Sequence, residues 1–271
     1  MSTHNTTRHA TGQSQHCEQP YDGADCHCGS GSSKTLVAGA PRIALAGAPN
    51  AGKTSIYNAL TGLHAKTGNY PGVTVQRSMG TCKVGGKTLT IEDLPGAYSL
   101  DPISPDEQIV HDVLTGTSTT VSAPDALVIV VDATTLQRGM NFIAEALALE
   151  LPTCLVVTMT DELTRRAGRL DVAALGQALG IPAVRVVGNR SIGIPELRER
   201  LTDIPSWQRP PLPAPTEPTE VASWADSILE AADYQAPQQD RITTAVDKVL
   251  LNPVLGSLVF FAIMYIFFQA I

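Results

Sequence analysis

The sequence predicts an α/β fold, a three-layer sandwich in which a mostly parallel six-stranded sheet carries helices on both faces. Three observations support this prediction. From Arg42 onward, short β-branched runs alternate with helix-length segments, a pattern typical of parallel sheets. The pair Gly85-Gly86 separates two strand-like runs, so we expect a hairpin and one antiparallel edge strand. A glycine-rich loop at 47–54 follows the first strand and precedes a helical run.

The expected strands are short and apolar, and helix-length segments separate most of them. In chain order they cover residues 42–46, 75–84, 87–93, 126–132, 153–158 and 182–187. The intervening lengths leave room for five helices.

Composition divides the chain into five parts. These are a flexible polar tail (1–40), the α/β domain (41–204), a proline-rich linker (205–220), a short helical connector (221–252) and a strongly apolar end (253–271). In the connector, one helical face collects apolar side chains, namely Val221, Trp224, Ile228, Leu229 and Ala232. This face needs a partner, which is the domain, the bilayer surface or a further part of the chain.

The apolar end has no charged residue over about 18 positions, the lower limit for crossing a bilayer. We therefore expect a C-terminal transmembrane helix over 253–271, with a buried core helix as the alternative. Its abrupt end favours a fragment of a longer membrane protein, and a tail anchor is the other option. We expect no secretory signal, because no charged segment followed by an apolar stretch is seen at the start of the sequence.

Charge argues against one class of partner. The 271 residues carry a formal charge of −7, with a pI of about 5.3. An acidic chain has no general attraction for a polyphosphate backbone, so we expect no nucleic-acid partner, and any phosphate site must be local.

The loop at 47–54 fits the phosphate-binding pattern G-x-x-x-x-G-K-[ST], between a strand and a helix as that pattern requires. Its glycines let several N–H groups turn toward one anion, and Lys53 then bridges the terminal phosphates. The Thr54 hydroxyl is the expected Mg²⁺ ligand. The residues predicted to contact nucleotide here are Gly47, Asn50, Ala51, Gly52, Lys53, Thr54 and Ser55. The fold is therefore expected to be that of a Ras-like P-loop GTPase, which binds GTP and GDP with Mg²⁺.

Two further segments suit the same chemistry. Asp93 ends a strand and Gly96 follows three residues later, so we expect Asp93 to hold Mg²⁺ through water and the Gly96 N–H to sense the third phosphate. Thr74, in the loop GNYPGVTVQ, is expected to reach the metal when a triphosphate is bound. The predicted catalytic set is Lys53, Thr74 and Gly96.

Five phrases together resemble the N-terminal part of the ferrous iron transport protein B family, FeoB. They are GAPNAGKTSIYNALTG, GNYPGVTVQ, DLPGAYSL, VVDATTLQRGMNF and TAVDKVLLNPVLGSLVFFAIMYIFFQ. The resemblance covers 41–201 and 243–271.

This resemblance implies a cytoplasmic GTPase domain joined to an inner-membrane domain that moves Fe(II). It also implies contact with membrane lipid, small cytoplasmic partner proteins of the same transport system and a homo-oligomer. Asn50 matches an asparagine that helps bind K⁺ beside the phosphates in potassium-activated GTPases, so K⁺ is an implied cofactor.

The chain departs from the family where the base is read. The usual Asn-x-x-Asp is Thr158 to Asp161 here. Asp161 can still accept two hydrogen bonds from guanine, whereas Thr158 lacks the carboxamide that braces the loop, so we expect weaker affinity. In the last base-contacting loop, Val187 and Gly188 offer only backbone contacts. The family's helical domain is expected to shrink to a single helix.

Ala97 follows Gly96 where Ras-like proteins have a glutamine that orients water, so slow intrinsic GTP hydrolysis is expected. Two alternatives stay open. In the first, the chain is a non-catalytic nucleotide sensor. In the second, it is a different GTPase of the same superfamily that acts in ribosome assembly or RNA modification.

Three cysteines and a histidine in the tail carry possible ligands for Fe(II) or Zn²⁺, namely Cys17, Cys26, His27 and Cys28. Their spacing matches no closed structural zinc site, so incidental ligands in a flexible tail are the alternative.

Overall fold

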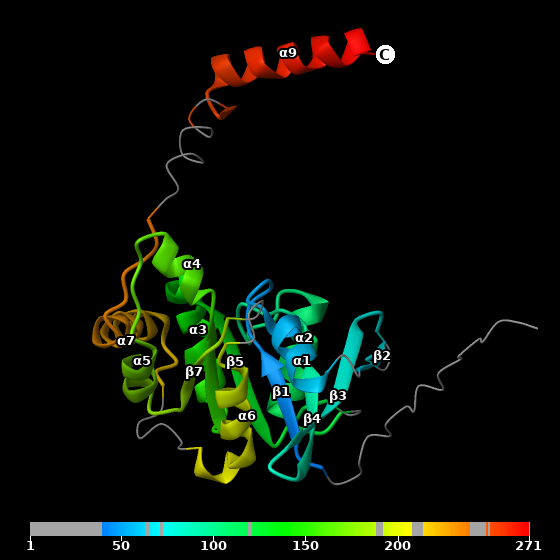
Figure 1. Cartoon of the computed structure of the whole chain (residues 1–271), viewed down its shortest axis with the longest axis vertical. Helices are drawn as coiled ribbons and strands as arrows, with labels where there is room; N and C mark the ends of the chain where they lie inside the picture. The colour runs from blue at the N-terminus through cyan, green and yellow to red at the C-terminus, as the bar shows by residue number, and fades with distance from the viewer. Residues whose placement is uncertain are drawn as a thin grey trace, which may run out of the picture. The chain divides into compact units, whose positions relative to one another are not determined.

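The computed structural model describes residues 40–62, 65–70, 73–118, 121–187, 192–207, 214–238, 248 and 250–270. Its centre is one seven-stranded sheet with the order β2-β3-β4-β1-β5-β6-β7 (Figure 1). The strands are β1 (Arg42–Ala46), β2 (Ala65–Asn69), β3 (Gln76–Val84), β4 (Lys87–Asp93), β5 (Ala126–Asp132), β6 (Thr153–Thr158) and β7 (Ala183–Arg185).

Five strands, from β4 through β1 to β7, are parallel, whereas β3 pairs antiparallel with β4. The antiparallel strand expected from the Gly85-Gly86 turn is thus confirmed as β3. The prediction of six strands is wrong by one, because β2 adds a further antiparallel pairing outside β3. Its five residues, AKTGN, lack the alternation of apolar side chains by which a strand is recognised in sequence.

Helices cover both faces of the sheet. They are α1 (Lys53–Thr61), α2 (Pro105–Thr115), α3 (Leu136–Leu147), α4 (Thr160–Arg165), α5 (Val172–Leu179), α6 (Ile194–Thr202) and α7 (Pro218–Ala231), with 3-10 turns η1 (Ala133–Thr135) and η3 (Ile204–Ser206). Two short helices, α4 and α5, fill the segment between β6 and β7, so the expected five helices are too few.

Strand alternation creates two separate cores. In β1, Ile43 and Leu45 pack with α1 and α6, whereas Ala44 and Ala46 face the core formed with α2, α3, α5 and α7. All four side chains are fully buried. The confirmed three-layer arrangement follows from this pattern.

Helix α7 belongs to the second of these cores. Its buried side chains Val221, Ala225, Ile228 and Leu229 lie in one cluster with residues of α3 and α5. In Figure 1, α7 runs beside α5. The apolar face of the connector helix therefore finds its partner in the domain.

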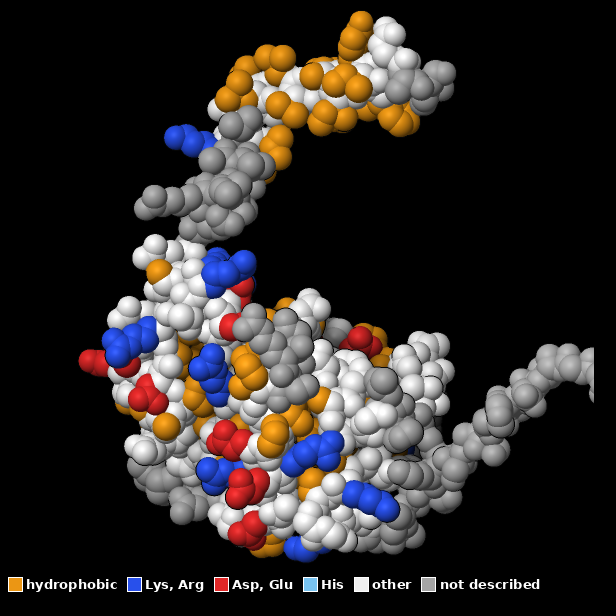
Figure 2. Space-filling model, in the orientation of Figure 1, with side chains coloured by type: hydrophobic (Ala, Val, Ile, Leu, Met, Phe, Trp, Pro, Cys, Tyr) orange, Lys and Arg blue, Asp and Glu red, His pale blue; other side chains and the backbone are white. Residues whose placement is uncertain are grey.

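Helix α9 covers the 18 residues Pro253–Ala270. It has exposed apolar side chains along its length, including Leu258, Phe261 and Ile266 (Figure 2). Within the described residues, no helix combines the length and the hydropathy needed to cross a membrane, so the transmembrane helix expected over 253–271 is not confirmed. Ile271 and residues 1–39 lie outside the described residues.

Candidate functional site

The phosphate-binding loop follows β1 at the carboxyl end of the sheet. Strand β1 lies between β4 and β5, and open α/β sheets place their ligands in the crevice outside the carboxyl ends of such strands. Gly47 has φ +143°, and a Cβ there would lie 2.1 Å from the Val130 carbonyl oxygen. Only glycine allows this loop to pass so close to β5.

Lys53 begins α1 and folds back into the loop. Its Nζ donates hydrogen bonds to the carbonyl oxygens of Gly47 and Ala48, both at 2.9 Å, and the side chain is 8% exposed. Burial lowers the pKa of Lys53, and the negative charge of Asp93 partly opposes this shift. The lysine charge is therefore held beneath the loop with little water around it.

Thr54 and Asp93 meet beside the same lysine. The Thr54 hydroxyl donates to Asp93 Oδ2 at 3.0 Å, while Asp93 Oδ1 is buried and has no hydrogen-bond partner among the described residues. Burial raises the pKa of Asp93, although the Thr54 hydrogen bond and the Lys53 charge lower it. A hydroxyl and a carboxylate with an unsatisfied oxygen are the hard donors that Mg²⁺ prefers, so these residues fit that ion.

The chain after Asp93 runs directly over the loop. Leu94 N–H donates to the Leu45 carbonyl and Ala97 N–H to the Gly47 carbonyl, each at 3.1 Å. A Cβ on Gly96 would lie 2.7 Å from Pro49 Cγ and 2.9 Å from its Cα. Gly96 thus allows a close approach of two functional segments. Ala97 is fully buried, and its methyl group cannot orient a water.

Thr74 lies in the loop that precedes β3. It is exposed in the turn between β2 and β3, which Tyr70 N–H closes by donating to the Val75 carbonyl at 2.9 Å. Ser78 pairs with Asp93, so Thr74 lies at the same edge of the sheet as the loop. No hydrogen bond among the described residues joins Thr74 to Thr54 or Asp93.

A buried charge cluster next to this turn was not predicted. Glu92 is fully buried on β4 and accepts hydrogen bonds from Tyr70 Oη at 3.0 Å and Arg77 Nε at 2.7 Å. Arg42 Nε lies 3.5 Å from its other oxygen, and the Arg77 guanidinium stands 5.5 Å from the centre of the Tyr70 ring. Burial and Glu92 raise the pKa of Tyr70. The sequence carries little signal for this cluster, because β4 (KTLTIED) has several polar residues besides Glu92.

At the base-reading end, Thr158 keeps a bracing contact. Its Oγ1 lies 2.8 Å from the Ala51 carbonyl oxygen and 3.0 Å from that of Val131. The Thr158 hydroxyl thus still contacts the phosphate-binding loop from the end of β6, while the expected loss of nucleotide affinity stays a prediction. A hydroxyl has one proton, so it serves one acceptor at a time.

Asp161 lies in the first turn of α4, after Met159, whose φ is +53°. It makes no hydrogen bond through its side chain to another described residue. Val187 is buried and its N–H donates to the Ile192 carbonyl at 3.0 Å, whereas Gly188 lies outside the described residues. Both base-contact assignments stay predictions.

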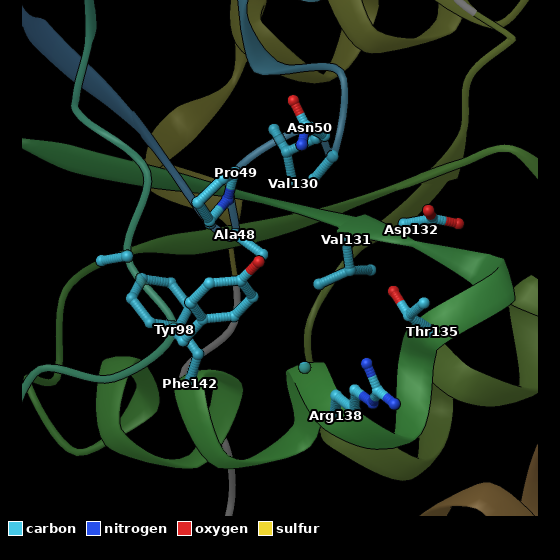
Figure 3. Close-up of a pocket in the computed structure, with 14 residues that line it drawn as sticks. Ala48, Pro49, Asn50, Tyr98, Val130, Val131, Asp132, Thr135, Arg138 and Phe142 are labelled. Carbon is cyan, nitrogen blue, oxygen red and sulfur yellow. The ribbon is translucent and has the colours of Figure 1, made fainter. Parts of the chain in front are cut away.

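A separate pocket of about 200 Å³ borders the loop on the side of α3 (Figure 3). In Figure 3, Tyr98 lies beside Phe142, while Asn50 stands at the far end of the view from Arg138. Lys53, Thr54 and Asp93 do not line it. The pocket residues are Gly47, Ala48, Pro49, Asn50, Ala51, Ala97, Tyr98, Val130, Val131, Asp132, Thr135, Arg138, Gly139 and Phe142.

The predicted tail ligands Cys17, Cys26, His27 and Cys28 lie outside the described residues, and their metal binding stays a prediction. Among the residues with described placement, no three His, Cys, Asp or Glu side chains form a metal-binding group.

The comparisons with known proteins agree with this geometry. A family described as ferrous iron transport protein B matches residues 41–201. The Fe(2+) transport protein A/Fe(2+) transporter FeoB fusion protein of Porphyromonas gingivalis is 39% identical over 163 residues, which is 60% of this chain and 19% of that protein. Against the curated relatives from P. gingivalis and Leptospira biflexa, the match spans 19% and 24% of their length.

Solved structures give the same result for the fold. The G domain of T. maritima FeoB has a TM-score of 0.55 and 34% identity, covering 61% of this chain and 99% of that one. A GDP-bound variant of the S. thermophilus FeoB G domain has a TM-score of 0.54 and 36% identity, covering 59% of each chain. The phosphate-binding loop, the neighbouring Thr54 and Asp93 and these matches lead to one conclusion: this chain belongs to the ferrous iron transport protein B family.

Proposed function

We propose that this chain binds GTP and GDP with Mg²⁺, hydrolyses GTP slowly and thereby regulates Fe(II) uptake through the membrane part of a longer transporter. The main support is the contact between Thr54 and Asp93 beside Lys53, with one buried Asp93 oxygen that finds no hydrogen-bond partner in the part of the chain that the structure describes. The GDP-bound FeoB relative supports the choice of a guanine nucleotide. Family membership does not favour a role in ribosome assembly or RNA modification.

In this proposal, each side chain acts on a different part of GTP. Lys53 gives up its carbonyl partners to bind the terminal phosphates, and the uncapped first turn of α1 offers N–H donors to the same anion. Asp161 accepts hydrogen bonds from the guanine edge, and Val187 and Gly188 contribute backbone contacts. When bound at Thr54 and Asp93, Mg²⁺ supplies charge neutralisation for the phosphates, with Thr74 as a further ligand.

The hydrolysis step needs a substitute for a water-orienting glutamine, because Ala97 cannot provide one. Asn50 is exposed, has φ +63° and makes no hydrogen bond through its side chain to a described residue. Its amide oxygen is thus available for K⁺ beside the phosphates. We propose that K⁺ stimulates turnover at this position.

Helix α9, with its apolar exposed surface, is proposed as the segment through which the domain is attached at the cell membrane, where it meets lipid. The G domain then lies on the cytoplasmic side. Partner proteins and a homo-oligomer are proposed on family grounds alone.

Titration with labelled GDP, GTP and ATP tests the proposal. We expect GTP and GDP to bind more tightly than ATP, and Asp161→Ala to remove that preference while leaving ATP binding unchanged. Glu230→Ala, an exposed change on α7, is the control. Tighter binding of ATP than of GTP would contradict the base assignment.

Single-turnover hydrolysis with K⁺ replaced by Na⁺ then tests turnover. Faster hydrolysis in K⁺, lost in Asn50→Ala, supports the enzyme. Binding without hydrolysis in either salt would instead support a non-catalytic sensor, the second candidate, which the buried Ala97 favours.

A further inference from the structure

The segment that follows Gly96 and Ala97 is held by two helices. Glu145 on α3 accepts hydrogen bonds from Ser99 Oγ, which lies 2.9 and 3.0 Å from its two oxygens, and from the Leu100 N–H. His111 on α2 has its Nδ1 2.8 Å from the Leu100 carbonyl oxygen. Both backbone polar groups of Leu100 are therefore bound to side chains of neighbouring helices.

The donors converge on one carboxylate. Asp101 N–H donates to Ser99 Oγ at 2.9 Å, and that hydroxyl donates in turn to Glu145. A charged acceptor makes stronger hydrogen bonds than a neutral one, and each bond polarises the next. Glu107 of α2 adds a longer contact, 3.4 Å from Tyr98 N. Glu145 thus carries the larger share of the contacts that order residues 99–101.

Residues 97–100 lie along one face of α3. Phe142 and Glu145 are three residues apart and lie on the same side of the helix. Phe142 lines the pocket with Ala97 and Tyr98 (Figure 3), and Glu145 binds the next two residues. The path of the chain from Ala97 to Leu100 is therefore set along α3.

We propose that Glu145 is a positioning residue for GTP hydrolysis: by holding Ser99 and Leu100 against α3, it keeps the Gly96–Ala97 backbone against the phosphate-binding loop. This inference rests on the proposed function. Since Ala97 offers no polar side chain, the placement of the reacting water depends on backbone groups, and their position depends on the residues that hold the segment. Among the described residues Glu145 has no hydrogen bond to Lys53 or Thr54, so in this proposal it acts on the reaction through Ser99 and Leu100.

The test compares full-length chains that carry Glu145→Ala, Glu145→Gln or Ser99→Ala with the parent and with Glu230→Ala. Amide hydrogen exchange of peptides over 97–104 is measured without nucleotide. Single-turnover GTP hydrolysis and labelled GDP affinity are measured on the same samples.

In Glu145→Ala we expect faster exchange at 97–104 and about tenfold slower hydrolysis or more, since hydrogen bonds to a charged acceptor carry effects of that order. GDP affinity stays within about twofold of the parent, because the phosphate-binding residues are untouched. Glu145→Gln keeps one carbonyl acceptor for Leu100 and recovers most of the rate, and Ser99→Ala lies between the two. If Glu145→Ala fails to fold, Glu145→Gln and Ser99→Ala test the proposal.

Parent-like exchange and hydrolysis in Glu145→Ala would overturn the proposal. Equal losses of hydrolysis and GDP affinity would also overturn it, because they indicate a general structural role. If the parent chain binds no GTP, the proposed function is overturned, and with it any role of Glu145 in hydrolysis. If the parent hydrolyses GTP and Glu145→Ala does so at the same rate, only the proposal for Glu145 is overturned.

Discussion

Thr158 makes a contact that its residue type does not predict. Its hydroxyl, at the end of β6, approaches the Ala51 and Val131 carbonyls. The residue type alone did not reveal this contact, because it depends on how closely β6 approaches the loop. Lys53, Thr54 and Asp93, in contrast, could be predicted from their spacing, since that spacing is dictated by the geometry of a strand, a loop and a helix.

Thr158→Val is expected to weaken GDP binding about fivefold, because it removes the one hydrogen bond that the hydroxyl donates to the Ala51 or Val131 carbonyl, and a typical hydrogen bond contributes about 1 kcal/mol. Titration with labelled GDP measures this change. Thr115→Val, which alters an exposed hydroxyl on α2, is the control. Parent-like affinity in Thr158→Val would show that the contact does not support the loop.

Asp93→Asn is expected to raise the thermal midpoint of the nucleotide-free protein at neutral pH. The pKa of Asp93 is raised by burial, so above that pKa the folded state bears the cost of a buried charge. The advantage of the amide disappears as the pH falls toward the ordinary value of 3.8, where the carboxyl of the parent is also neutral. Thermal unfolding followed against pH measures this trend.

The same change is expected to weaken Mg²⁺-dependent GTP binding by about 10- to 100-fold, as is typical when a carboxylate that supports a metal site is lost. Normal GTP binding by Asp93→Asn in the presence of Mg²⁺ would show that Asp93 does not support the metal site. A lower thermal midpoint than the parent at neutral pH would contradict the assigned cause of the pKa shift.

At the scale of elements, the hairpin of β2 and β3 was the hardest part to predict. The Gly85-Gly86 turn and the strand-like run before it identify β3, whereas β2 is an edge strand that pairs with β3 alone among the described strands. Tyr70 then fixes the end of β2 to Glu92, a contact between residues 22 positions apart. The residues around Tyr70 in the sequence do not predict this pairing.

Tyr70→Phe is expected to lower the free energy of unfolding by about 1–3 kcal/mol, because Glu92 is fully buried and loses a donor. Urea unfolding measures the change. Tyr98→Phe removes a hydroxyl from a side chain that is 59% exposed, and we expect it to stay within about 0.5 kcal/mol of the parent. Equal effects of the two changes would mean that the Glu92 contact does not stabilise the hairpin.

For the whole molecule, α7 extends the folded domain beyond the proline-rich linker. The composition of 205–220 suggested a boundary, yet α7 packs on α3 and α5, and Gln235 pairs with Arg169 through both backbone groups. An amphipathic pattern tells which face of a helix is buried, but not against what.

A chain of residues 40–238 is therefore expected to unfold cooperatively with a thermal midpoint close to that of the full chain. A chain of residues 40–207 exposes the core beneath α7 and loses on the order of 5 kcal/mol, given 1.5–3 kcal/mol for each large apolar side chain. Thermal unfolding of both chains measures the difference. The same midpoint in both would show that α7 adds nothing to the fold.

The two cysteines inside the domain have a practical consequence for the rest of the chain. Cys82 is 1% exposed and Cys154 is fully buried, and burial raises the pKa of Cys154 to about 12, so neither presents a thiolate to solvent. The other three of the five cysteines precede residue 40. Any alkylation by maleimide in the native protein therefore reports on that stretch alone, and its suppression by added Fe(II) or Zn²⁺ would register metal capture there without a change to the sequence.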